Sequence, residues 1–206
     1  MEIVTAPNGP FMVNTYLVIN SAEKKCILID PGYEITDILK KIDADKLALE
    51  AIMATHGHID HVEGVNTVLA KFKAPFYANE KDKELIMTVP IQSRMFGVKN
   101  PGEILIDKNL PDSGELEFAG MKLKLLHTPG HSKGSISILI ENSVFTGDAL
   151  FNMSIGRTDL PGGNYELLIS SIRKHLFTLP DACKIFPGHG PDSTIGYEKK
   201  MNPFFR

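Results

Sequence analysis

The sequence has no tryptophan, only two cysteines and no strong excess of charge of either sign. Its 22 Lys and Arg residues almost balance its 25 Asp and Glu residues, which gives a formal net charge of -3. A domain that binds nucleic acid normally carries a basic surface. We therefore expect no nucleic-acid partner.

Long apolar runs are also missing. No run approaches the roughly 20 residues that a membrane-spanning helix needs. Residues 1–5 lack the basic segment and apolar core of an export signal, so we expect a cytoplasmic protein without a membrane partner. Cys26 and Cys183 lie in apolar, strand-like runs, which favours reduced, buried thiols over a disulfide.

What is present fits one large domain over residues 1–206, with 43% apolar residues to form its core. Patterns of Val, Ile and Leu predict strands over residues 11–19, 25–30, 51–54, 75–78, 121–125, 136–140, 143–146 and 183–186. Helical spacing predicts helices near residues 35–42, 62–72, 81–87 and 164–179, with a partly irregular excursion over 79–111. Each half contains strands followed by a helix, so the predicted fold is an αββα sandwich: two sheets face to face with helices outside.

The most informative stretch is Thr55-His56-Gly57-His58-Ile59-Asp60-His61, which directly follows an apolar run. Three of the chain's seven histidines and a carboxylate lie here. Imidazole and carboxylate are the usual protein ligands of zinc, iron and manganese. His56 and His58 can reach one ion from the same side, while Asp60 and His61 continue towards a neighbouring position. The spacing therefore indicates two metals.

Further ligand candidates end other predicted strands. Two Pro-Gly pairs are followed at once by histidine, at His131 and His189, and Asp148 follows Gly147 at the end of a third strand. A Pro-Gly turn fixes the backbone sharply, so each side chain has little freedom at the sheet edge. We expect these strand ends to converge on one rim of the sandwich.

The order of these motifs along the chain resembles that of the metallo-β-lactamase-fold hydrolases. The HxHxDH stretch comes first, followed by a Pro-Gly-His turn, the Gly-Asp pair and a second Pro-Gly-His turn. The resemblance is closest to the glyoxalase II (hydroxyacylglutathione hydrolase) branch and covers nearly the whole chain. It implies two sets of metal ligands and one bridging carboxylate: His56, His58 and His131; Asp60, His61 and His189; and Asp148 between them. It also implies that Asp30 steadies the ligand loop from outside, although a strand-ending Asp before a turn is the ordinary alternative.

The resemblance implies hydrolysis of a small-molecule thioester such as S-lactoylglutathione. Two divalent ions, zinc or else iron or manganese, would lower the pKa of a shared water from about 15.7 to near 7. The resulting metal-bridging hydroxide would attack the carbonyl carbon, and Asp60 would orient the nucleophile and accept its proton. Thioesters suit this chemistry because a thiolate departs with little protonation.

One segment departs from the glyoxalase II pattern. Where that family usually has a Lys and a Tyr that contact glutathione, this chain has Arg157 and Asp159. Arg157 is a candidate for gripping a substrate carboxylate through two aligned donors. The alternative is a surface ion pair with Asp159. The short tail after His189 is similar to that of single-domain bacterial hydrolases of this branch, and it lacks the family's glutathione-binding helical domain.

Two rival functions stay open. Persulfide dioxygenases share the HxHxDH loop, bind a single iron and resemble this chain over residues 155–159, whereas a non-catalytic metal scaffold or sensor would need the ligands alone. A secreted β-lactamase would need an export segment. Of the other histidines, His127 is expected to be packed or to support a ligand, and His175 to lie at the surface. Residues 88–102 could form a substrate-side flap or a dimer contact, and the oligomeric state is not predicted.

Overall fold

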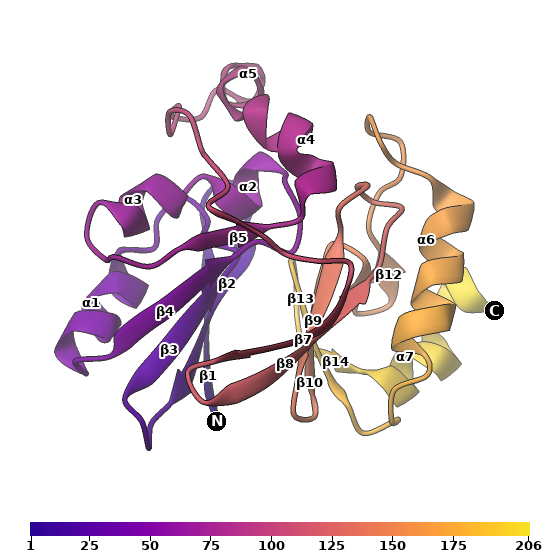
Figure 1. Cartoon of the computed structure of the whole chain (residues 1–206). Coiled ribbons are helices and arrows are strands. Elements are labelled where there is room, and N and C mark those ends of the chain that lie inside the picture. Colours follow the sequence, from indigo (N-terminus) through magenta and orange to yellow (C-terminus); the bar gives the residue numbers. More distant parts are fainter.

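Two six-stranded sheets pack face to face in the computed structural model, which describes residues 1–206. Helices cover the outer face of each sheet (Figure 1), so the predicted αββα sandwich is confirmed. None of the helices combines the length and apolar character needed to cross a bilayer.

The first sheet contains the strands of the N-terminal half in sequence order. They are β1 (Glu2–Asn8), β2 (Val13–Asn20), β3 (Lys25–Ile29), β4 (Ala48–Met53), β5 (Phe76–Ala78) and β6 (Lys108–Asn109). The first three run antiparallel, and the pairs from β3 to β6 are parallel. The helical segments of this half are α1 (Thr36–Ala44), α2 (Ile59–Val62), α3 (Val65–Leu69), η1 (Glu80–Asp82), α4 (Lys83–Met87) and α5 (Val89–Phe96).

The second sheet has the order β14-β13-β10-β9-β8-β7. Its strands are β7 (Ser113–Phe118), β8 (Met121–His127), β9 (Ile136–Ile140), β10 (Ser143–Gly147), β13 (Lys184–Pro187) and β14 (Ser193–Thr194). A separate hairpin joins β11 (Leu150–Phe151) and β12 (Ser154–Ile155). The helical segments are α6 (Tyr165–Ser171), η2 (Ile172–Leu176), α7 (Ile195–Met201) and η3 (Pro203–Phe205).

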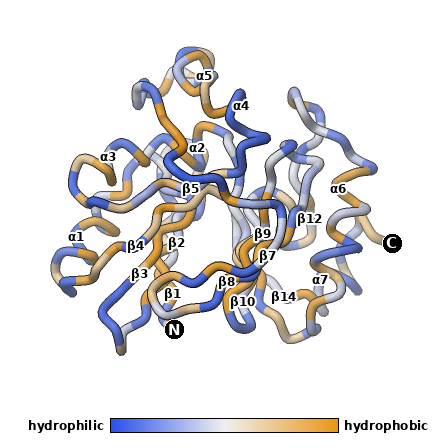
Figure 2. The backbone as a smooth tube through the Cα atoms, viewed as in Figure 1, coloured by the Kyte–Doolittle hydropathy of each residue, from blue (hydrophilic) through white to orange (hydrophobic).

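Three apolar layers hold the sandwich together, and strand alternation assigns residues to them. On β3, Cys26 and Leu28 pack in the layer under the N-terminal helices, whereas Ile27 and Ile29 pack between the sheets. Successive strand side chains point to opposite faces, so one strand supplies two layers. Figure 2 shows the hydrophobic residues running along these central strands. Cys183 lies in the third layer, under α6 and α7, so the two cysteines are free and buried as predicted.

Two predicted elements differ from the structure. The single helix expected near residues 62–72 is two short helices, α2 and α3. The break follows from Gly64, whose backbone N–H donates to Pro31 O at 2.9 Å and whose added Cβ would lie 2.2 Å from Gly32 O. Part of the stretch expected to be irregular is the regular helix α5. Pro90 does not interrupt this helix, because it stands in the first turn, where a missing N–H is tolerated.

Strands β1 and β7 were not predicted, nor was α7. Both strands lie at sheet edges and are largely exposed or half-buried. An edge strand needs no continuous apolar face, so its sequence carries a weaker strand signal. The helix expected over 164–179 is present, but its second half winds as the π-type turn η2.

Candidate metal centre

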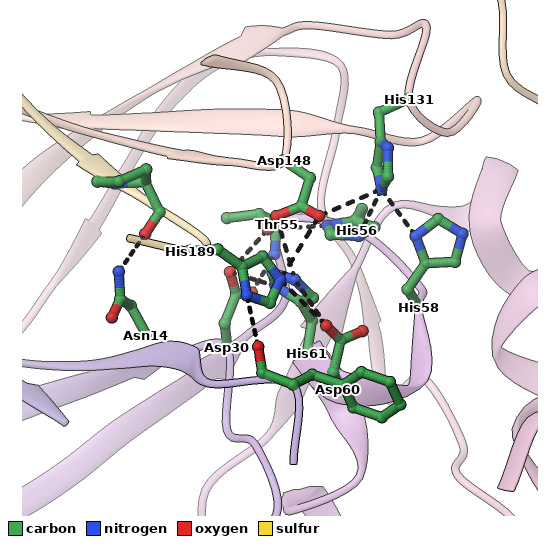
Figure 3. Close-up of polar contacts among 12 residues, drawn as sticks. Asn14, Asp30, Thr55, His56, His58, Asp60, His61, His131, Asp148 and His189 are labelled. Atoms are coloured by element: carbon green, nitrogen blue, oxygen red, sulfur yellow. Dashed lines mark hydrogen bonds and ion pairs between the residues drawn. The ribbon is translucent and has the colours of Figure 1, made fainter. Parts of the chain in front are cut away.

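Both sheets deliver side chains to one rim of the sandwich. The chain leaves β4 into the His56–His58 loop and enters α2, which carries Asp60 and His61. The second sheet contributes from the ends of three strands. Figure 3 shows that the predicted metal ligands from the two halves face one another: His56, His58, Asp60, His61, His131, Asp148 and His189.

Three imidazoles form the first cluster, here called group A: His56, His58 and His131. One nitrogen of each lies within 4.8 Å of the others. His131 Nε2 is 2.8 Å from His58 Nδ1 and 3.2 Å from His56 Nε2. Three nitrogens so close together and aimed inward form a pocket of electron-pair donors.

The second cluster, group B, consists of Asp60, His61 and His189, whose ligand atoms also lie within 4.8 Å of one another. Asp60 Oδ2 is 3.1 Å from His189 Nε2 and 3.7 Å from His61 Nε2. Asp148 lies between the groups. Its Oδ1 is 3.3 Å from His61, and its Oδ2 is 3.5 Å from His131 in group A. The carboxylate thus contacts both groups.

Hydrogen bonds outside the cluster fix which nitrogen of each ring faces inward. His131 Nδ1 lies 2.8 Å from Arg157 O, and His189 Nδ1 lies 3.0 Å from Phe11 O. A carbonyl oxygen only accepts, so each Nδ1 carries a proton, and each Nε2 is the nitrogen turned towards the cluster. His61 Nδ1 contacts the Asp30 carboxylate at 2.9 Å with the same effect. These rings are oriented as metal-ligating histidines usually are.

Two atoms of the cluster have no hydrogen-bond partner. His61 Nε2 and Asp148 Oδ1 are buried, and neither makes a hydrogen bond although they are 3.3 Å apart. Leaving a buried polar atom unsatisfied costs about 1–3 kcal/mol. A divalent cation would satisfy both atoms, and mixed imidazole and carboxylate donors suit zinc, iron or manganese. The residues present therefore fit divalent metal ions.

The surroundings shift the pKa values of the histidines in opposite directions in the two groups. Burial lowers the pKa of His56 well below its usual range, and burial together with the His131 ring lowers the pKa of His58 to about 4. Burial also opposes protonation of His61, but the carboxylates of Asp30, Asp60 and Asp148 outweigh it and raise the pKa of His61. The pKa of His189 is raised too, because burial is outweighed chiefly by its contact with Asp60 and by the Asp148 charge.

Asp30 occupies the supporting position expected of it. Its buried carboxylate accepts hydrogen bonds from Thr55 N at 2.6 Å and Thr55 Oγ1 at 2.7 Å, in addition to the His61 contact. Its backbone has φ +50°, a left-handed conformation that turns the chain sharply at the end of β3. Asp30 therefore does more than end a strand, because it joins β3 to the ligand loop.

Asn14 is a supporting residue that the sequence analysis missed. Its side-chain amide donates to Pro187 O at 3.0 Å, a contact drawn in Figure 3. It also donates to Gly190 O at 2.9 Å, and the two bonds hold the turn that carries His189. The available signal was a buried polar residue inside the apolar strand β2. That signal shows that the side chain needs partners. It does not identify them, because they lie more than 170 residues away in the sequence.

The Arg157 side chain lies at the surface beside the site. Its Nε and Nη2 donate to the two carboxylate oxygens of Asp159, both at 2.8 Å, with the arginine side chain 61% exposed. The surface ion pair considered as an alternative is therefore formed. The backbone carbonyl of Arg157 orients His131. A contact between the Arg157 side chain and a substrate carboxylate stays a prediction.

His127 and His175 lie outside both groups. His127 Nε2 contacts Lys133 O at 3.0 Å and is partly buried, which agrees with the expected packed position. His175 is partly exposed, which agrees with the expected position at the surface.

Helix α5 lies against the metal-site loops. Gln92 Oε1 accepts the Ile59 N–H at 3.2 Å, and the Phe96 ring meets the Phe11 ring edge-on at 5.1 Å between centroids. Phe11 in turn holds His189 through its carbonyl. Phe96 is 54% exposed and Met12 is 60% exposed. We call Phe11, Met12 and Phe96 the apolar lip, and its position favours the substrate-side alternative for this segment.

The other exposed apolar residues of this segment are Met87, at the end of α4, and Ile91 and Met95 on α5. The dimer contact, the second alternative left open for residues 88–102, would involve these residues and is not tested by the structure.

The model of the metallo-beta-lactamase superfamily matches residues 8–189 of this chain. A protein of Haemophilus influenzae named hydroxyacylglutathione hydrolase GloC is 40% identical to it, over 99% of this chain and 98% of the relative. The match therefore includes every candidate ligand described above.

Solved structures agree with this assignment. The structure described as the BLEG-1 B3 metallo-beta-lactamase aligns with a TM-score of 0.92 and 34% identity, covering 99% of both chains. The di-iron-bound form of TTHA1623 aligns with a TM-score of 0.88 and 34% identity, covering 98% of this chain and 99% of that one. From its fold, its converging ligand set and these matches, the chain belongs to the metallo-beta-lactamase superfamily, whose members are generally metal-dependent hydrolases.

Proposed function

We propose that the chain is a dinuclear metal-dependent hydrolase that cleaves a thioester, with a hydroxyacyl thioester such as S-lactoylglutathione as the model substrate. The observation that carries the proposal is the convergence of groups A and B on the shared Asp148 carboxylate, with ring nitrogens turned inward. Group A would hold one divalent ion and group B the other. The name of the Haemophilus relative supports the choice of substrate class.

Two divalent ions held in these groups would lower the pKa of a bound water and polarise a substrate carbonyl. Part of this centre is accessible to solvent. The side chain of His61 is fully buried, whereas those of Asp60 and His189 are 15% and 27% exposed. His58 of group A is also partly exposed, so the centre is open along the rim. The proposed entry for substrate is the part of this rim at Asp60 and His189, next to the apolar lip.

Asp60 is the proposed catalytic carboxylate on that side. His189 Nε2, 3.1 Å from Asp60 Oδ2, holds the carboxylate at the mouth of the site. The attraction of His61 and a hydrogen bond from His189 outweigh burial, which would raise the pKa, and so keep Asp60 ionised. An ionised carboxylate at that point can orient a water molecule and accept its proton.

The polar end of the site lies on the other side, near His131. The Arg157 guanidinium, held by Asp159 in a fixed direction at the rim, is the proposed contact for a charged thiol carrier. The apolar lip would then face the acyl group.

The dioxygenase alternative keeps support from the ligand loop and the segment over residues 155–159, and iron itself is compatible with the donor set. The di-iron form of TTHA1623 shows a similar chain holding iron, but two atoms of it. The presence of Asp60, His61 and His189 as a second complete group favours a dinuclear centre over a mononuclear one.

Metal content and turnover on one sample would test the proposal. The protein is purified without added metal, its zinc, iron and manganese are measured per chain, and S-lactoylglutathione is supplied while free thiol is followed. We expect two metals and thiol release that stops when a chelator removes them. One iron with oxygen uptake on glutathione persulfide would establish the dioxygenase instead.

Two further arms separate the remaining rivals. The β-lactam nitrocefin tests the activity named for the BLEG-1 structure, and we expect it to be a poorer substrate than the thioester. Two bound metals without turnover of any thioester would favour the non-catalytic scaffold or sensor.

A further inference from the structure

Asp82 is a buried carboxylate outside both ligand groups, and it connects the two halves of the molecule. It ends η1 and is 2% exposed. Although it stands just before α4, its side chain makes no capping bond to that helix. The carboxylate instead faces the two loops that carry group A.

Three donors from these loops converge on Asp82. Gly57 N–H, between His56 and His58, donates to Oδ2 at 3.0 Å. On the other side, Ser132 Oγ donates to Oδ2 at 2.6 Å and Gly134 N–H donates to Oδ1 at 2.7 Å. Ser132 directly follows His131. One carboxylate thus fixes the backbone beside all three imidazoles of group A.

Close packing reinforces these bonds. A Cβ added at Gly57 would lie 3.0 Å from Asp82 Cβ, and one added at Gly134 would lie 2.8 Å from Asp82 Cγ. Both glycines are needed so that their loops can approach the carboxylate. Asp82 itself is anchored because Asn79, at the start of η1, donates to Leu110 O at 2.8 Å.

We propose that Asp82 is a positioning residue for metal binding by group A, holding the His56–His58 loop and the His131 turn at the separation one ion requires. Nothing comparable links it to group B, whose members are held by Asp30, by the Phe11 carbonyl and, through the turn, by Asn14. The inference rests on the metal-binding part of the proposed function. It predicts that one metal site can be weakened without the other.

Asp82→Asn is the informative change because it preserves size and removes only an acceptor. Both carboxylate oxygens receive hydrogen bonds, so either orientation of the amide sets its NH₂ group against a donor. The strain would act on the two loops that must close around an ion. Outer-shell changes of this kind typically weaken metal affinity by about 10- to 100-fold.

Glu198→Gln supplies a matched control for general destabilisation. Glu198 is also fully buried and also accepts three hydrogen bonds, from Ser193 Oγ, from Met153 N at 3.0 Å and from Asn202 Nδ2 at 2.8 Å. It lies on α7 and contacts neither ligand group. The two variants should lower the melting temperature similarly, but only Asp82→Asn should alter metal binding.

The experiment titrates zinc into metal-free full-length protein against a competing chelator and resolves two affinities. We expect Asp82→Asn to weaken one affinity by about 10- to 100-fold and to leave the other within about three-fold. Ser132→Ala, which removes one of the three donors and keeps the carboxylate, should weaken the same affinity to a smaller extent. This milder variant decides the matter if Asp82→Asn does not fold.

Two unchanged affinities in Asp82→Asn, or an equal loss at both sites, would overturn this inference and leave the proposed function intact. Loss of metal in Glu198→Gln equal to that in Asp82→Asn would also overturn it. A wild-type chain that binds no divalent metal would overturn the metal-dependent function and this inference together.

Discussion

Groups A and B face the same centre but are prepared for metal in different ways. Group A contains imidazoles only, and the pKa values of His56 and His58 are lowered, so these two rings are neutral without a metal. Group B contains a carboxylate, and the pKa values of His61 and His189 are raised by neighbouring carboxylates. The comparison indicates that group A is ready to bind an ion, whereas group B must release protons first.

The largest effect is expected from a change at Asp148, because this change should affect groups A and B alike. Asp148 contacts both groups, so Asp148→Asn should weaken both metal affinities and lower thioester turnover by about 10³-fold. Metal content per chain and the rate of thiol release measure the two effects. Loss of one metal with the second retained at full affinity would show that Asp148 serves only one group.

The pH dependence of metal binding should sharpen the comparison. A ligand with a raised pKa holds its proton at higher pH, and metal must displace that proton. As pH falls through the raised pKa values of His61 and His189, group B should lose affinity by about ten-fold per pH unit for each proton displaced.

Group A should keep its affinity to a lower pH, because burial and the neighbouring His131 ring lower the pKa of His58 to about 4. Zinc titrations at pH 7.5, 6.5 and 5.5 would measure both affinities. Parallel loss at the two sites would contradict the expected difference.

A smaller effect is expected at the proposed substrate entry beside group B. Phe96→Ala removes an exposed ring from the apolar lip and should raise the KM of a thioester with a butyryl or hexanoyl group by about three- to ten-fold. The acetyl thioester of the same thiol should be affected less. Phe204→Ala removes a comparably exposed ring, 41% exposed, at the far C-terminal helix and should change neither value.

The smallest expected effect is that of Arg157→Ala. The ion pair with Asp159 is exposed, so its loss should leave the melting temperature unchanged. If Arg157 contacts a charged thiol carrier, KM for S-lactoylglutathione should rise while KM for a neutral thioester stays constant. Equal KM values for wild type and variant on both substrates would remove Arg157 from the substrate site.

The positions of the ligand candidates could be predicted because each follows a strong local signal. HxHxDH lies directly after an apolar strand, and His131 and His189 each follow a Pro-Gly turn. Strand ends at one edge of a sandwich must lie near one another, so local patterns were enough to place these side chains together. Edge strands such as β1 escaped prediction because exposure leaves them without a continuous apolar pattern.

The fold class and the candidate metal ligands could be predicted from the sequence, since strand periodicity and ligand spacing are properties of neighbouring residues. The contacts that hold these ligands in place could not, because they join distant parts of the chain. Asn14 reaches a turn more than 170 residues away, and Asp82 joins loops 25 and 50 residues distant. A single buried polar residue shows that it needs partners, but packing alone chooses which distant atoms they are.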